Sequence, residues 1–142
     1  MTREPIYAAL FSLLSGVADF VTVSRRLVHW ADVPAAAQPA MFVAQKSEDH
    51  VVLTNTPMRL RLMVNVYIYV NAGNDPNATP ATQLNNILDA LDAAFKIRSP
   101  SENQTLGGLV SYCRIAGNIQ TDEGVLGDQA IAIVPVEMMV NH

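Results

Sequence analysis

The feature that most constrains the fold of this chain is a sustained two-residue alternation between Met58 and Val70. Every even position from 60 to 70 is aliphatic, whereas the odd positions carry polar, aromatic or sulfur-containing side chains. Because successive side chains of a β-strand point to opposite faces, the pattern predicts a strand over 58–70 with one face in the core. About twelve residues at roughly 3.3 Å each span some 40 Å. Since this is long for a chain of 142 residues, we expect part of the strand to reach a neighbouring molecule.

The odd face of this strand is the first candidate for a functional surface. Its members are Arg59, Arg61, Met63, Tyr67 and Tyr69, together with an asparagine. Arginine, methionine and tyrosine are enriched at protein interfaces, which favours a subunit contact. The alternative is that a helix or another layer of the same chain covers this face, and the sequence alone leaves both interpretations open.

Periodicity also predicts the remaining elements. Apolar residues at helical spacing predict helices over 3–15, capped by Thr2, and over 80–96, capped by Thr79. Shorter runs predict strands at 20–27, 41–46, 50–54, 109–119 and 129–140, with a polar turn at 47–49 between the second and third of these. Residues typical of turns predict loops at 30–39, 71–82, 98–108 and 120–128.

The order of these elements shows no regular alternation of strand and helix. It predicts a single α+β domain over residues 1–142, with a mostly antiparallel sheet and two main helices packed on one face. Pro135 lies in the last expected strand and has no N–H to donate. We therefore expect that strand to lie at the edge of the sheet or to carry a bulge at Pro135.

The balance of apolar and charged residues indicates self-association. Half of the residues are apolar and 15% are charged, against about 25% charged residues in a typical soluble domain. The net charge is −4 and the basic residues occur singly or in pairs, whereas a nucleic-acid-binding module normally has a basic face. The apolar stretch at 6–17 is shorter than the roughly 20 residues of a membrane span. Neither nucleic-acid recognition nor a membrane partner is therefore expected.

The residue types that usually carry chemistry form no catalytic or metal-binding pattern. His29, His50 and His142 are far apart and have no cysteine or carboxylate at metal-ligand spacing. Cys113 alternates within an apolar run, which favours a buried structural thiol over a nucleophile. We expect no catalytic residue, no cofactor and no metal, and hence no enzyme activity.

A short acidic cluster is the second candidate for a functional segment. Asp122, Glu123 and Asp128 lie in the loop expected between the last two strands. Either this loop or the loop expected at 71–82 is a candidate to face a channel or an axial partner. The simpler alternative is a solvated loop.

Four segments of the chain carry a resemblance to a known family. They are REPIYAALF at 3–11, VSRRL at 23–27, HWADVP at 29–34 and QPA at 38–40. In these segments and in the order of its elements, the chain resembles the minor tail, or tail terminator (tail completion), proteins of long-tailed bacteriophages and prophages. The motifs concern packing and turns, so no functional residue is carried over by position.

The resemblance implies a structural protein of the virion tail that is assembled in the host cytoplasm. Such proteins are α+β proteins that form a hexameric ring on the head-proximal end of the tail tube, stop tube polymerisation and present a surface for head-tail joining. The partners implied are further copies of the chain, the tail tube protein and the head-tail connector protein. The genome would pass through the central channel without specific binding, because six copies at −4 each carry about −24 and repel phosphates.

Other interpretations of the same features remain open. Within the tail assembly, the chain fits a tail tube protein or a neck connector ring protein. From a different class, a small homo-oligomeric enzyme or ligand-binding domain would have a similar length and composition. A pocket with convergent titratable groups would favour this last alternative.

Overall fold

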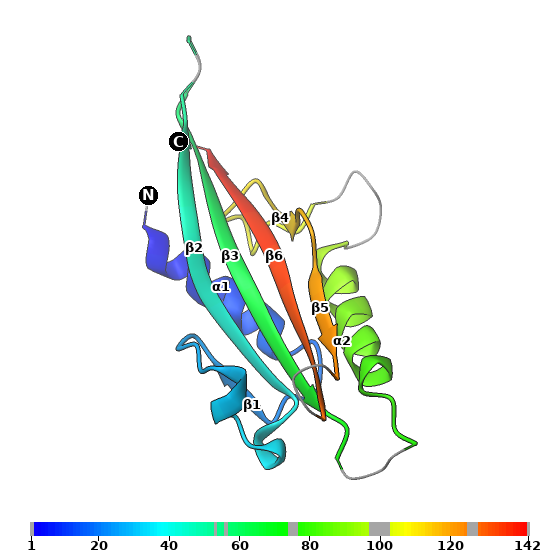
Figure 1. Cartoon of the computed structure of the whole chain (residues 1–142). Helices are drawn as coiled ribbons and strands as arrows, with labels where there is room; N and C mark the ends of the chain where they lie inside the picture. The colour runs from blue at the N-terminus through cyan, green and yellow to red at the C-terminus, as the bar shows by residue number, and fades with distance from the viewer. Residues whose placement is uncertain are drawn as a thin grey trace.

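The computed structural model describes residues 2–52, 54–55, 57–73, 77–96, 103–124 and 128–141. Its elements are α1 (Arg3–Ser15), β1 (Thr22–Ser24), the short 3-10 helices η1 (Trp30–Asp32) and η2 (Ala35–Ala37), β2 (Ala40–Val51), β3 (Arg59–Asn71), α2 (Pro80–Phe95), β4 (Tyr112–Ile115), β5 (Gln120–Glu123) and β6 (Gln129–Asn141). The prediction of an α+β fold is confirmed. Figure 1 shows a long twisted sheet with both α-helices on the side away from the viewer.

The sheet is built on two long central strands. Its order is β1-β2-β3-β6-β4, and β5 also pairs with β6. β3 and β6 are antiparallel along their whole length, from the pair Arg59 and Asn141 to the pair Asn71 and Gln129. The remaining pairings are antiparallel too, except that β1 runs parallel to β2 over three positions. The sheet is therefore mixed, with a small parallel component at one edge.

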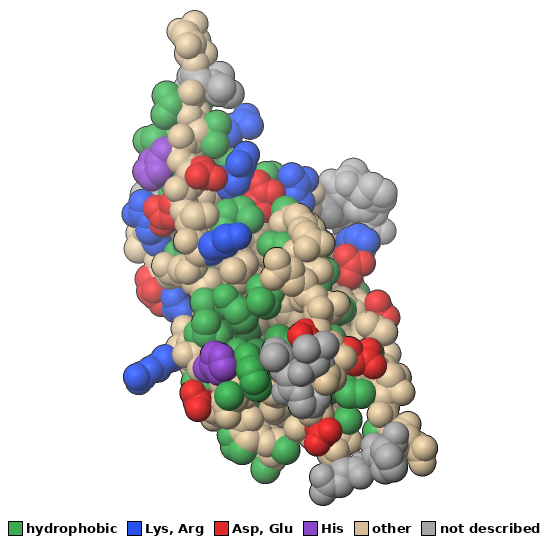
Figure 2. All heavy atoms as spheres, viewed as in Figure 1, with side chains coloured by type: hydrophobic (Ala, Val, Ile, Leu, Met, Phe, Trp, Pro, Cys, Tyr) green, Lys and Arg blue, Asp and Glu red, His purple; other side chains and the backbone are tan. Residues whose placement is uncertain are grey.

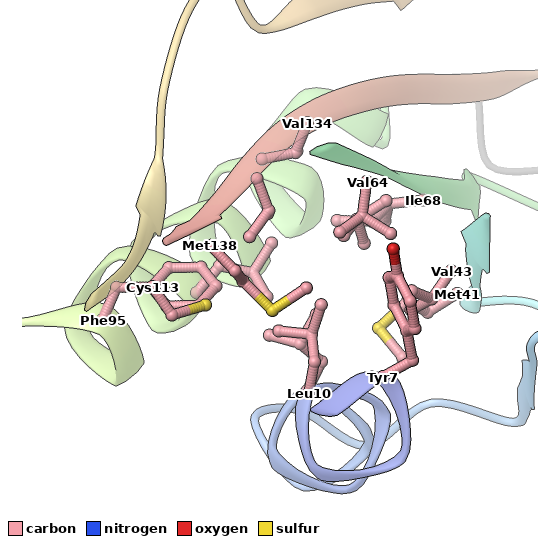
Figure 3. Close-up of a cluster of buried hydrophobic side chains, with 14 of the residues drawn as sticks. Tyr7, Leu10, Met41, Val43, Val64, Ile68, Phe95, Cys113, Val134 and Met138 are labelled. Carbon is pink, nitrogen blue, oxygen red and sulfur yellow. The ribbon is translucent and has the colours of Figure 1, made fainter. Parts of the chain in front are cut away.

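The main core lies between this sheet and the two helices. The even-numbered side chains of β3 and β6 point into it, as the alternation in β3 predicts. They meet Leu10 and neighbouring residues of α1 and Phe95 of α2, and Figure 3 shows these side chains converging with Met138 and Cys113. Each fully buried aliphatic or aromatic side chain contributes about 1.5–3 kcal/mol. This burial fixes which face of the sheet the helices cover.

A second, smaller core lies on the opposite face of the sheet, which we call the outer face. There, the segment 28–38 crosses one half of the sheet and buries the rings of Phe42 and Tyr69, whose centroids are 5.5 Å apart. The Tyr69 hydroxyl donates a hydrogen bond to the Val28 carbonyl oxygen at 2.9 Å. The Gln38 side-chain amide donates to the Gln129 side-chain oxygen at 3.0 Å. These contacts hold the segment against the sheet.

The prediction of two strands at 41–46 and 50–54 is wrong, because β2 is a single strand of 12 residues. Its pairing with β3 shifts between Gln45 and Ser47, which leaves one extra residue in β2 and marks a β-bulge. The polar segment 47–49 remains paired with β3. It is exposed, so polar residues are tolerated there and do not signal a turn.

The prediction for the last strand is also wrong, since β6 is a central strand. The carbonyl oxygen of Pro135 accepts a hydrogen bond from the Ala116 N–H at 3.1 Å. In a strand the N and O of one residue point to the same side, so the missing N–H of Pro135 faces the gap between Ile115, where β4 ends, and Gln120, where β5 begins. Proline removes no ladder bond at this position.

The short strands differ most from expectation. β1 is shorter than the predicted 20–27, and β4 occupies only part of the predicted 109–119. β5 lies within the segment 120–128 that was expected to be a loop. The expected loops at 71–82, 98–108 and 120–128 fall partly outside the described residues, at 74–76, 98–102 and 125–127.

Candidate interaction surface

One half of the outer face has no covering segment among the described residues. The segment 28–38 crosses the half that contains the C-terminal end of β3, and the other half is open. We call this the open half. It consists of Ser47, Asp49, Arg61, Met63, Tyr112, Arg114, Glu137 and Met139. Figure 2 shows basic and acidic side chains gathered on the upper part of this face and hydrophobic ones below them.

The residues of the open half come together through the register of four strands. Asp49, Arg61, Met139 and Tyr112 form one row across β2, β3, β6 and β4. Ser47, Met63, Glu137 and Arg114 form the next row. Because directly opposed residues share a face of the sheet, these side chains are neighbours although they are far apart in the sequence.

Glu137 is the centre of an ion-pair network in the open half. Its side chain is 10% exposed, and its Oε1 lies 2.9 Å from the Nε of Arg61. Its Oε2 lies 3.6 Å from the Nε of Arg114. The Tyr112 hydroxyl donates a hydrogen bond to Oε1 at 3.2 Å. Two cations and one donor therefore compensate for the burial of this carboxylate.

The two arginines nevertheless keep part of their charge accessible. Their side chains are 41% exposed at Arg61 and 60% exposed at Arg114. The Nε–H of Arg61 is close to Glu137 but makes no hydrogen bond, and Asp49 lies 3.7 Å from this guanidinium. The guanidinium of Arg114 lies 4.2 Å from the centroid of the Tyr112 ring. An approaching molecule meets both these arginines and the carboxylate of Asp49, whose side chain is 58% exposed, whereas Glu137 is largely covered.

The structure leaves some of the predicted surface residues exposed and buries others in the second core. Arg59 is exposed at the beginning of β3, and Arg61 and Met63 lie in the open half. Tyr67 is partly buried against the second core. Tyr69 is 3% exposed, so we remove it from the candidate surface and assign it to the packing of segment 28–38.

The predicted acidic cluster lies at the other end of β6. Asp122 and Glu123 belong to β5, where they pair with Ile131 and Ala130, and Asp128 directly precedes β6. The side chains of Glu123 and Asp128 are exposed. A channel or axial position for these residues stays a prediction, because it depends on how copies of the chain are arranged.

Sequence reasoning did not find Tyr112, Arg114 or Glu137. A signal for Glu137 was present, because it is the one charged residue in the strand QAIAIVPVEMMVN. Charged residues in buried strands are rare unless an opposite charge pairs with them. The identity of the partners required the pairing of β6 with both β3 and β4.

A second accessible feature is the outer edge of β2. β1 pairs only with Ala40, Met41 and Phe42, and no strand of the described residues pairs with the rest of that edge. A hollow of about 300 Å³ beside it is lined by Tyr7 and residues 45–48. Within it, Glu48 accepts a hydrogen bond of 2.6 Å from the Nε–H of Arg3.

Over the described ranges, no group of three or more histidine, cysteine or acidic side chains could hold a metal ion. In the same ranges, no helix has the length and apolar character needed to cross a bilayer.

Burial also sets the ionisation of several groups. It raises the pKa of the Cys113 thiol to about 12, so this thiol is neutral in the folded chain. The pKa of Tyr112 is raised, first by burial and then by the charge of Glu137. Burial disfavours the charged form of both groups.

The comparisons with known proteins add little to this description. No family model matches the chain, and no curated protein matches it. Several solved structures match, and one of them does so over 100% of this chain and 96% of its own, with 16% sequence identity and a TM-score of 0.49. The function has to be inferred from the residues of this chain.

Proposed function

We propose that this protein is a structural subunit of a bacteriophage tail. Copies of it form a ring at the head-proximal end of the tail tube, where the ring ends tube polymerisation and provides the head-tail joining surface. The proposal is supported by the resemblance of the segments between residues 3 and 40 to tail terminator proteins. It also accounts for the low content of charged residues.

The observation that supports the inference of self-association is the open half of the sheet. A β-sheet in a globular domain usually packs a layer on each apolar face. Here α1 and α2 pack on one face, whereas segment 28–38 covers only one half of the other. The open half contains the partly exposed Met63 beside the accessible side chains of Arg61 and Arg114, whereas Met139 is only 8% exposed. Partly apolar surfaces with arginine are typical of protein interfaces.

A ring requires each copy to use two different surfaces. A heterologous contact joins the surface of one copy to another surface of the next, and it gives a closed ring when the rotation between copies closes. The open half is one such surface. This geometry is the same for a terminator, a tube protein and a neck connector, which differ in whether rings stack.

The test is the assembly of the purified protein. Size-exclusion chromatography with light scattering and negative-stain microscopy should show single closed rings. Long cylinders would instead identify a tube protein, and particles that remain monomeric at all concentrations would contradict the proposal. Added to polymerising tube protein of the same phage, the ring should limit the length of the tubes. A neck connector would leave that length unchanged.

A substitution in the open half tests which surface mediates assembly. Met63→Gln replaces an apolar side chain of the open half with a polar one of similar length, places no acid opposite Glu137, and should raise the concentration at which rings form. Val21→Gln introduces the same side chain at an apolar position that is 61% exposed and lies outside the open half. This matched control should assemble like the unchanged protein.

A further inference from the structure

We infer that segment 28–38 is a movable cover. It opens as a unit while the rest of the chain stays folded, and its opening extends the open half into a larger apolar face that a neighbouring copy binds. The role in assembly rests on the proposed function and adds its regulation. The opening itself is a property of the single chain, so it can be measured without assembly.

The first observation is how the segment is attached. Among the described residues, every backbone-to-backbone hydrogen bond of segment 28–38 has both partners inside the segment, in or beside η1 and η2. β3, in contrast, pairs with β6 along all 13 of its residues. The described hydrogen bonds between the segment and the sheet involve side chains, in the pairs Tyr69 with Val28 and Gln38 with Gln129. Regions with so few hydrogen bonds to their surroundings open more easily than the core strands.

The second observation is how little of the segment is buried. Of its eleven residues, Val33 and Gln38 are buried, Val28, Trp30 and Ala37 are partly buried, and the other six are exposed. The Oε1 of Gln38 is buried without a hydrogen-bond partner among the described residues. On opening, this oxygen regains water and the eleven residues regain conformational freedom. Both effects offset the lost packing, so the closed form is favoured by a small margin.

The third observation is what the segment covers. Beneath it lie Phe42, Tyr69 and Ile131, which are 1%, 3% and 7% exposed. Figure 1 shows the segment on the viewer's side of the lower part of the sheet, below the open half. The exposed groups of the open half are largely polar and its arginines are already ion-paired, whereas the centres of protein interfaces are apolar. The apolar part of the outer face is accessible to a neighbour only when the segment is open.

This arrangement regulates assembly. When a partner binds only the open form, its apparent affinity is reduced by the fraction of chains that are open. Free copies at low concentration therefore stay closed and separate, and the contact holds the segment open once copies have met. A substitution that loosens the segment should therefore favour assembly, although it destabilises the free chain.

The first experiment measures opening in the monomer through the reactivity of a thiol. Val33→Cys places a thiol at a position of the segment that is 8% exposed, and the native Cys113, which is 1% exposed in the main core, is the reference in the same chain. A maleimide should label the new thiol at least about 100-fold faster than Cys113, at a rate that low urea concentrations hardly change. Equal rates with equal urea dependence would overturn the inference, because the segment would then open only in global unfolding.

A matched pair of substitutions identifies what holds the segment closed. In the Val33→Cys chain, Tyr69→Phe removes the hydrogen bond to Val28 and should speed labelling about two- to tenfold. Tyr112→Phe removes a hydrogen bond to Glu137 in the open half and should leave the rate unchanged. Hydrogen exchange in the unchanged chain should show the amides of segment 28–38 exchanging before those of β3. Exchange of both groups together would refute local opening.

The second experiment tests the role in assembly. Tyr69→Phe alone should lower the concentration for half-assembly by the same factor by which it speeds labelling, since it raises the open fraction. A tyrosine with a purely structural role predicts the opposite shift. An unchanged or raised concentration would therefore overturn the role in assembly and leave the ring proposal intact. An unchanged protein that never forms rings would overturn the proposed function and the role in assembly, whereas labelling of the monomer decides the opening in either case.

Discussion

Replacing Glu137 with glutamine tests how the charge network of the open half contributes to stability. The substitution keeps the shape of the side chain and an oxygen that can accept the hydrogen bond of Tyr112. It removes the negative charge that faces Arg61 at 2.9 Å and Arg114 at 3.6 Å. The change in the free energy of unfolding therefore reports how much the two ion pairs contribute to stability.

The expected loss follows from the exposure of the three partners. Ion pairs between exposed groups contribute about 0.2–1 kcal/mol each, and breaking a fully buried pair costs about 3–5 kcal/mol. The side chain of Glu137 is 10% exposed, but those of Arg61 and Arg114 are 41% and 60% exposed, so the guanidinium groups regain water when the carboxylate is removed. We expect Glu137→Gln to cost about 1–1.5 kcal/mol, which lowers the Tm by roughly 3–6 °C.

The measurement is urea unfolding at several protein concentrations, which separates folding from assembly. The matched control is Asp92→Asn, which removes the surface pair of Asp92 and Lys96, whose side chains are 53% and 75% exposed; it should cost at most about 0.5 kcal/mol. In 1 M salt, where the Debye length is about 3 Å, the loss for Glu137→Gln should shrink. A loss above about 3 kcal/mol would refute the assumption that the guanidinium groups are solvated, and a loss equal to that of the control would refute the network.

Other predictions concern the two cores. The folded Cys113 thiol has a pKa of about 12 against an ordinary value of 9.0. Its contribution to stability is therefore complete below pH 9 and is lost as the pH rises towards 12. In unfolding curves measured at alkaline pH, Cys113→Ala should flatten this decline in stability. A thiol reagent should label Cys113 only when the chain unfolds. Leu62→Ala, at a position that is 0% exposed, should cost about 2–5 kcal/mol in denaturant unfolding, whereas Val52→Ala, at 74% exposure, should cost less than about 0.5 kcal/mol. Tyr69→Phe removes the hydrogen bond to Val28, so it should cost about 1 kcal/mol and speed proteolysis within segment 28–38.

Elements with strong periodicity could be predicted from the sequence. The alternation of β3 and the helical spacing in α1 both give the observed bounds to within a residue. Each of these elements has one buried face, and burial is what selects the pattern. Local sequence therefore suffices to predict an element that has one buried side and one exposed side.

The errors occur where pairing overrides composition. Segment 47–49 continues β2 because β3 supplies its hydrogen-bond partners, although its residues are typical of turns. Pro135 is tolerated in a central strand because its missing donor faces a gap between two short strands. Nothing in the local sequence records either long-range partner.

The candidate surface could be predicted only in part for the same reason. Alternation places Tyr69 and Arg61 on one face of β3, but the path of segment 28–38 decides that the first is buried and the second exposed. The partners of Arg61 come from β2 and β6, which lie on either side of β3. One strand can therefore reveal a face of the sheet without revealing what covers it.

The central position of β6 has a consequence for synthesis of the chain. β3 and β2 can pair as a hairpin as soon as both have left the ribosome, but the second neighbour of β3 is made only after α2, β4 and β5. At about 5–20 residues per second, the hairpin waits roughly 3 to 12 s for β6 to begin to appear. Because Glu137 and Met139 belong to β6, a nascent or truncated chain has no complete open half. Under the proposed self-association, only chains translated through β6 would have the complete open half that assembly uses.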